Sequence, residues 1–140
     1  DRFADVSDEL IVCTDDGSHG RKALVTEPLK EVCAREPKPG QAFVIGPPLM
    51  MKFCCQATLP FGVPTQVSLN TIMIDGTGMC GGCRVEVDGK AKFVCVDGPE
   101  FDGHKVNFDL MIKRLGAYKK QEQQAHESYK QHRCRIGLNG

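Results

Sequence analysis

The stretch IDGTGMCGGCRVEVDGKAKFVC, residues 74–95, places three cysteines in a glycine-rich loop and the segment that follows it. Cys80 and Cys83 form a C-x2-C pair, and eleven residues separate Cys83 from Cys95. Thiolates at this spacing are typical of metal and iron–sulfur sites. Three sulfur ligands are one short of the usual four, so the stretch predicts a site with a fourth ligand of another kind.

The second half of this stretch alternates in polarity. RVEV and KAKF flank Asp88-Gly89, and Asp-Gly between alternating segments is a strong signal for a β-hairpin. We therefore expect a small hairpin subdomain over residues 74–105, with Cys95 on the returning strand.

The segment upstream alternates between expected strands (10–14, 42–46 and 65–73) and expected helices (26–33 and 49–59). The first two strands are almost continuously apolar, which indicates a parallel sheet of α/β type. A doubly wound nucleotide-binding domain has five or six such strands. Three parallel strands, without a GxGxxG loop, predict the C-terminal half of such a domain, so residues 1–73 are expected to form a partial NAD(P)-binding unit.

The C-terminal part predicts a long helix over residues 106–133 and a disordered tail over 134–140. The start of the helix carries an apolar stripe, and the remainder is polar all round, as in a solvated helix or one that meets a partner. The stripe consists of Phe108, Met111, Leu115 and Tyr118.

The composition excludes several classes of function. The 140 residues include 18 basic and 18 acidic side chains, so neither nucleic acid nor an anionic membrane is an expected partner. No apolar run is long enough to span a membrane, and we expect no signal peptide. Four further cysteines interrupt apolar or helical segments and are expected to be small buried side chains in a reducing cytoplasm. They are Cys13, Cys33, Cys54 and Cys55.

The fourth ligand can be sought by comparing cysteine spacings. A plant-type [2Fe–2S] site has the order C-x4-C-x2-C…C, and Asp75 stands where the first cysteine belongs. Zinc held by the three cysteines with Asp75 or His104 is an alternative. A zinc ribbon lacks its second C-x2-C pair, and a thioredoxin-like pair would open a helix rather than precede a hairpin. Asp75 could also be only the first residue of an Asp-Gly turn.

Three stretches carry a resemblance to a known family: residues 14–32, residues 43–54 and the cysteine-bearing segment 75–104. They resemble the C-terminal part of the ferredoxin–NADP reductase superfamily, in the branch of flavin- and [2Fe–2S]-bearing electron-transfer subunits. This branch includes subunits of dihydroorotate dehydrogenase, sulfide dehydrogenase, NADH-dependent ferredoxin:NADP oxidoreductase and cytosolic NAD(P)-linked hydrogenases. The chain is therefore expected to be a truncated, by itself inactive, part of a NAD(P)H-linked flavoprotein oxidoreductase.

The resemblance implies a [2Fe–2S] cluster, with NAD(P)H and FAD bound by the full-length protein. Electrons would pass from nicotinamide through flavin and cluster to a larger catalytic subunit, or in reverse. The implied cluster ligands are Asp75, Cys80, Cys83 and Cys95, and the aspartate matches the sulfide-dehydrogenase-like branch. A zinc-stabilised interaction domain without redox function remains the alternative.

The resemblance also implies sites for the nucleotide and the flavin, and no catalytic residue of the chain's own. Gly46 and Pro47 match the family's stretch beside the nicotinamide and flavin, although Ile45 replaces its cysteine. Without the resemblance, Pro48 would only be a proline in the first turn of a helix. An incomplete sheet leaves apolar surface exposed, so we also expect the chain to self-associate. The loop expected near the nicotinamide nucleotide, otherwise a polar turn, consists of Thr14, Asp15, Asp16, Gly17 and Ser18.

Overall fold

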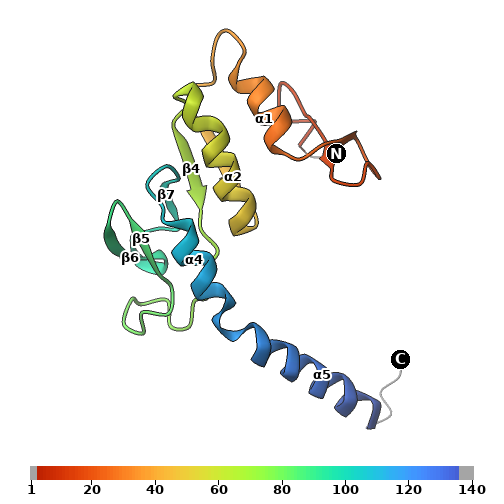
Figure 1. The fold of residues 1–140 in the computed structure, drawn as a ribbon, viewed down its shortest axis with the longest axis vertical. Coiled ribbons are helices and arrows are strands. Elements are labelled where there is room, and N and C mark those ends of the chain that lie inside the picture. Colours follow the sequence, from red (N-terminus) through yellow and green to blue (C-terminus); the bar gives the residue numbers. More distant parts are fainter. Residues whose placement is uncertain (1–2, 136–140) are drawn as a thin grey trace.

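A small sheet packed against one helix forms the centre of the fold (Figure 1). The computed structural model describes residues 3–135, with side chains over residues 3–130. In the sheet, β3 (Ala42–Ile45) and β4 (Thr65–Ser68) pair in parallel, and β7 (Glu100–Asp102) pairs with β4 antiparallel. The covering helix is α2 (Pro48–Thr58), which a short 3-10 helix, η1 (Leu59–Phe61), continues.

The central sheet is therefore not the expected set of three parallel strands. The first strand is reduced to β1 (Cys13–Thr14), which pairs in parallel with β2 (Arg21–Lys22) in a separate two-stranded sheet. The loop between them folds back, so that the Arg21 and Ala23 N–H groups bond to the carbonyls of Val12 and Thr14. These local bonds satisfy the Val12 and Thr14 carbonyls, and β7 supplies the third strand of the central sheet instead.

The expected helices form, with one break. The helix α1 occupies Thr26–Cys33 as predicted and packs on α2. The single helix expected over residues 106–133 consists of three elements: α4 (Phe108–Leu115), η2 (Gly116–Tyr118) and α5 (Lys119–Arg135). Glycine has low helix propensity, and the break begins at Gly116. The helix α5 extends away from the body of the molecule (Figure 1).

Two details at the C-terminal end differ from the expectations. Phe108 and Met111 are buried, but Tyr118, at the end of the predicted apolar stripe, is 60% exposed because it lies beyond the break. The predicted tail begins inside α5, and its residues 136–140 lie outside the described residues, as does the side chain of Cys134.

The predicted hairpin is present. β5 (Arg84–Val87) and β6 (Lys90–Phe93) pair antiparallel around Asp88-Gly89. Cys95 does not lie on the returning strand, because β6 ends at Phe93 and the chain enters a single helical turn, α3 (Val94–Asp97). In that turn the Asp97 carboxylate accepts a hydrogen bond from the Phe93 N–H at 2.7 Å.

One core joins the sheet to the hairpin. Met51 and Val67 from the α/β part and Val94 from the hairpin segment are fully buried in the same cluster, which also includes Met111 of α4. Gly103 lies where this core is tightest, because a methyl group there would collide with Cys55 Sγ and meet Val67 Cγ1 at 2.9 Å. The boundary predicted at residues 73/74 thus separates segments of sequence that share one apolar core.

Cys33, Cys54 and Cys55 are buried, as expected of small apolar side chains, and Cys13 is half-buried. No helix within residues 3–135 combines the length and the apolar character needed to cross a bilayer.

Candidate functional site

The loop that enters the hairpin is organised around the carboxylate of Asp75. Its Oδ1 accepts a hydrogen bond from the Thr77 N–H at 2.9 Å, and its Oδ2 accepts one from the Cys80 N–H at 2.8 Å. These bonds, that of Thr77 foremost, lower the pKa of Asp75 below its ordinary value. Asp75 is therefore an anionic, exposed group bonded to the backbone of the first cysteine of the C-x2-C pair.

Cys83 and Cys95 meet across the hairpin. Their sulfur atoms lie 3.2 Å apart and share a hydrogen bond, with Cys83 at 1% exposure just before β5 and Cys95 half-buried in α3. Burial opposes ionisation of Cys83, but the backbone N–H and thiol of Cys95 favour its thiolate and lower its pKa. The shared bond raises the pKa of Cys95, so Cys83 is the more acidic thiol of the pair.

Cys80 lies at the exposed end of the site. Its sulfur accepts a hydrogen bond from the Gly82 N–H at 3.4 Å, a donor of the kind that tunes thiolate ligands. The loop approaches α3 closely at Gly78, whose φ is +83° and where a methyl group would lie 2.8 Å from Val96 Cγ2. A glycine is needed here both for the backbone conformation and for the approach to the turn that carries Cys95.

The structure therefore brings the ligand atoms of Cys83 and Cys95 together, and it joins the Asp75 carboxylate to the backbone N–H of Cys80. Among the described residues, no three His, Cys, Asp or Glu side chains converge closely enough to hold a single metal ion. Three thiols and an ionised carboxylate on one loop and its hairpin still provide the donor set for an iron–sulfur cluster, and two sulfurs are already in contact. The residues present fit such a group.

His104, the other candidate for a fourth zinc ligand, is engaged elsewhere. Its Nε2 lies 3.0 Å from Thr58 Oγ1, which lies 2.7 Å from Thr65 Oγ1, and Thr65 donates to the Val63 carbonyl at 3.0 Å. Both threonines are buried, so this chain of hydrogen bonds satisfies polar groups in the core between α2 and β4. The sequence offered no signal for it, because the three side chains lie on separate elements.

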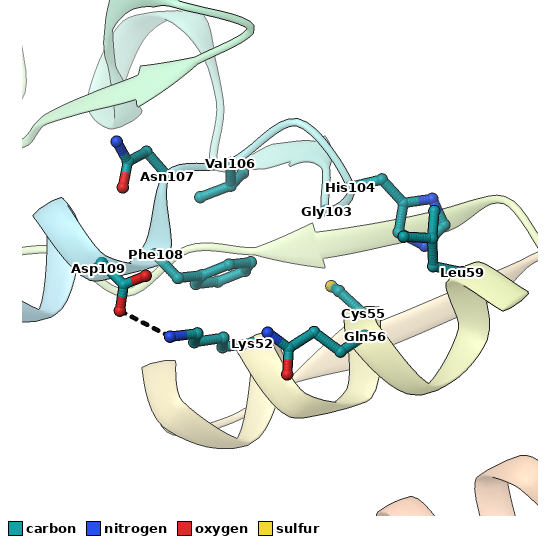
Figure 2. Close-up of a pocket in the computed structure, with 10 residues that line it drawn as sticks. All are labelled: Lys52, Cys55, Gln56, Leu59, Gly103, His104, Val106, Asn107, Phe108 and Asp109. Atoms are coloured by element: carbon teal, nitrogen blue, oxygen red, sulfur yellow. Dashed lines mark hydrogen bonds and ion pairs between the residues drawn. The ribbon is translucent and has the colours of Figure 1, made fainter.

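The same region contains a cavity of about 250 Å³ between α2 and residues 103–109 (Figure 2). At its rim, Lys52 Nζ and Asp109 Oδ1 form an ion pair at 2.6 Å. Cys55 lies in its wall, and burial raises the pKa of this thiol to about 12. A thiol that stays protonated is a poor nucleophile, so Cys55 has a packing role here.

The loop predicted to lie near the nicotinamide nucleotide forms an exposed turn. Thr14 Oγ1 donates to the His19 carbonyl at 3.0 Å, and Asp16 Oδ1 accepts from the Ser18 N–H at 2.9 Å. The bond from Ser18 lowers the pKa of Asp16, which keeps its carboxylate ionised. The remaining members, Asp15 and Gly17, are also exposed.

Gly46 and Pro47 follow the carboxyl end of β3, which ends one residue earlier than predicted, and Pro48 lies in the first turn of α2. Gly46 is half-buried and Pro47 exposed. The strands that precede these two candidate segments belong to different sheets, so the structure does not bring residues 14–18 and 46–47 to one sheet edge.

Comparison with known proteins finds a family that matches the hairpin segment. Residues 70–107 match the family described as the iron–sulfur cluster binding domain of dihydroorotate dehydrogenase B. This range contains Asp75 and all three candidate cysteine ligands. The chain is similar to proteins of the ferredoxin–NADP reductase-like superfamily.

Relatives extend this similarity beyond the iron–sulfur domain. A dihydroorotate dehydrogenase B (NAD(+)) electron transfer subunit homolog from Thermotoga maritima is 51% identical over 129 residues, which cover 92% of this chain and 45% of the relative. A probable electron transfer subunit of the same enzyme from Methanocaldococcus jannaschii is 42% identical over 86% of this chain and 44% of its own. The chain therefore spans somewhat less than half the length of these curated relatives.

A solved structure shares the fold. It belongs to a study of flavin-based electron bifurcation in the NADH-dependent reduced ferredoxin–NADP oxidoreductase. The match has a TM-score of 0.77 at 49% identity and covers 92% of this chain and 46% of the solved one. The mixed α/β architecture, with several small sheets and a long C-terminal helix, is consistent with a C-terminal domain like that of ferredoxin–NADP reductases.

Proposed function

We propose that this chain is the electron-transfer module of a flavin- and iron–sulfur-dependent NAD(P)H oxidoreductase. The observation that carries the proposal is the match of residues 70–107 to an iron–sulfur cluster binding domain, with the three cysteines on the loop and hairpin that this range encloses. The zinc-stabilised interaction domain is the weaker alternative, since the match is to an iron–sulfur family and His104 bonds to Thr58.

In this proposal Asp75, Cys80, Cys83 and Cys95 hold a [2Fe–2S] cluster. When bound, such a cluster accepts and releases one electron at a time. The chain's own contribution is to position it: the hairpin core holds Cys83 and Cys95 together, and the loop holds Cys80 beside the Asp75 carboxylate. The Gly82 N–H, by donating to Cys80, favours electron density on that sulfur.

The finer assignments of the nucleotide and flavin sites are part of the same proposal. In the longer protein, residues 14–18 would lie near a bound NAD(P)H, and Gly46 with Pro47 would approach the nicotinamide and FAD. Their position at the carboxyl ends of β1 and β3 supports this, because ligands of open α/β folds bind beyond the carboxyl ends of strands. A larger catalytic subunit would exchange electrons with the cluster, as the description of a relative as an electron transfer subunit homolog suggests. The whole protein would be a cytoplasmic enzyme of hydrogenase, sulfide dehydrogenase or ferredoxin:NADP oxidoreductase type, and the similar solved structure supports the last of these.

Measuring the iron, zinc and acid-labile sulfide content of the chain tests this function. The chain purified without oxygen is expected to contain iron and acid-labile sulfide in equal amounts, near two of each per chain, because a [2Fe–2S] cluster has this stoichiometry. Colorimetric sulfide determination, together with elemental analysis for iron and zinc, makes the measurement.

The matched control is the triple variant C80S/C83S/C95S, which should contain neither iron nor sulfide. The variant C33S keeps all candidate ligands and loses a buried thiol elsewhere, so it should retain both. Stoichiometric zinc without sulfide in the parent chain would overturn the proposal in favour of the zinc domain.

A further inference from the structure

A second cavity, of about 190 Å³, lies between the segment that leads into the cluster loop and the helical elements α4 and η2. Its base is apolar: Met111 is 1% exposed, and Leu115 is half-buried beside it. Arg84 and Arg114 line the cavity from β5 and α4, and Thr71 lines it from the incoming segment. None of the residues that line it is an Asp or a Glu.

Three polar side chains of this cavity, those of Thr71, Arg84 and Arg114, lack a partner among the described residues. Thr71 Oγ1 is buried and makes no hydrogen bond. Neither Arg84 nor Arg114 forms an ion pair within the part of the chain whose side chains are described. Arg21 and Arg35, the two other arginines with described side chains, each bind a glutamate. Among the arginines whose side chains are described, the two without an ion pair are thus the two that border the cavity.

The two unpaired arginines and the buried Thr71 hydroxyl together favour a bound anion. Two like charges beside one small concave surface produce a positive potential that attracts an anion. A buried hydroxyl without a partner is unfavourable until a ligand or water supplies one. Guanidinium groups bind carboxylate and phosphate oxygens through paired N–H donors, so an oxyanion would satisfy both requirements at once.

The rest of the cavity limits what carries the oxyanion. Met111 and Leu115 offer apolar contacts, and the ring of Tyr118 lies at the edge with 60% of its surface exposed. Such walls favour a flat apolar or aromatic body, whereas an inorganic ion would leave them in contact with water. We propose that this cavity binds a small organic anion, a carboxylate or phosphate on a planar apolar body. The site goes beyond the proposed electron-transfer function and uses none of its ligands.

Titration calorimetry on the 140-residue chain with three related probes tests the site. Benzoate has both the charge and the ring, benzamide lacks the charge, and acetate lacks the ring. Benzoate is expected to bind at one site per chain, and each of the other two about tenfold or more weaker, because each loses one of the two classes of contact. Phenyl phosphate, titrated alongside, distinguishes a phosphate ligand from a carboxylate ligand.

Variants locate the binding. R84Q and R114Q should each weaken binding of the preferred probe about tenfold, and R114K should do so as well because it keeps the charge but not the planar fork. T71V should weaken binding less and change no charge. K113Q is the matched control, since Lys113 is exposed on α4 next to Arg114 but does not line the cavity, and it should leave binding unchanged.

Two results would overturn the proposal. One is the absence of saturable binding of both benzoate and phenyl phosphate to the parent chain. The other is equal loss of binding in K113Q and R114Q, which would indicate attraction to the charge of the surface in general. Far-UV circular dichroism of each variant confirms that it is folded, and R114K, the mildest change, serves if a glutamine variant is not.

Discussion

At the scale of the residue, Asp75 combines two properties that substitution can separate. Its carboxylate caps the loop by accepting from two backbone N–H groups, and we propose that it also ligates the cluster. D75N keeps an oxygen acceptor for the loop but removes the anionic ligand. D75A removes both, and D75C supplies a thiolate at the position where the plant-type C-x4-C-x2-C…C order has its first cysteine.

We predict that D75A and D75N both lose the cluster faster than the parent chain, whereas D75C retains it with a shifted visible spectrum, because a soft sulfur replaces a hard oxygen. Absorbance and visible circular dichroism, followed over time under air, provide the measurement. D88N is the control, because it removes one carboxylate at the hairpin tip, where asparagine tolerates the positive φ of 53°. A parent-like spectrum and lifetime in D75A would show that Asp75 only caps the loop.

The spacing of residues in the sequence suggested three cysteine ligands, and the resemblance added Asp75, but neither predicted how these side chains are arranged. The C-x2-C motif suggests Cys80 and Cys83 as partners, yet the structure pairs the sulfur of Cys83 with that of Cys95. This pairing depends on the hairpin and on the turn α3, which place residues twelve apart next to each other. The position of His104 could not be predicted for a similar reason, since Thr58 is 46 residues away.

At the scale of the element, the start of α4 joins the C-terminal helices to the hairpin. Asn107 caps the helix by accepting from the Leu110 N–H at 3.1 Å, and its amide donates to Glu86 Oε1 on β5 at 2.9 Å. One side chain therefore serves both as a helix cap and as a contact between elements.

We predict that N107A lowers the free energy of unfolding by about 1–2 kcal/mol, because the helix loses its cap and Glu86 loses a donor. N107S should recover part of the loss, since serine caps the helix but does not reach β5. Urea denaturation followed by circular dichroism gives these values. N70A, at an exposed asparagine without a side-chain partner among the described residues, is the control and should change stability little. Equal stability of N107A and N70A would contradict this role.

Elements with strong local signals could be predicted from the sequence, and those that depend on distant pairing could not. The helix α1 and the hairpin turn at Asp88-Gly89 lie at the positions that the local sequence predicted. β7 is only three residues long, with Phe101 buried between two exposed side chains, and it is too short for this alternation to predict a strand. It forms a strand because its backbone pairs with the free edge of β4.

At the scale of the whole molecule, one face of the central sheet is uncovered. Val44 of β3 faces the core, while its neighbours Phe43 and Ile45 are 65% and 73% exposed. Adjacent strand residues point to opposite faces, so these two side chains mark the face opposite α2. The sheet has only three strands, and no further element covers this face within the described residues.

We predict that the isolated chain self-associates through this face, because contact between two copies removes apolar surface from water. Size-exclusion chromatography with light scattering, under reducing conditions, should give a mass above that of one chain. F43T/I45T should give a single chain, and Y129S, which removes an exposed ring from α5, should behave like the parent. A parent chain that remains monomeric at high concentration would contradict the prediction.

The sequence by itself determined the local features: the order and spacing of four candidate ligands, the hairpin around Asp88-Gly89, and the alternation of apolar segments typical of an α/β fold. These depend on residues close together in the chain, so spacing and propensity suffice. The tertiary structure decided which strands share a sheet, which sulfurs touch, and that Arg84 and Arg114 border one cavity. Those outcomes depend on how distant segments pack into a single core, and no local pattern records that packing.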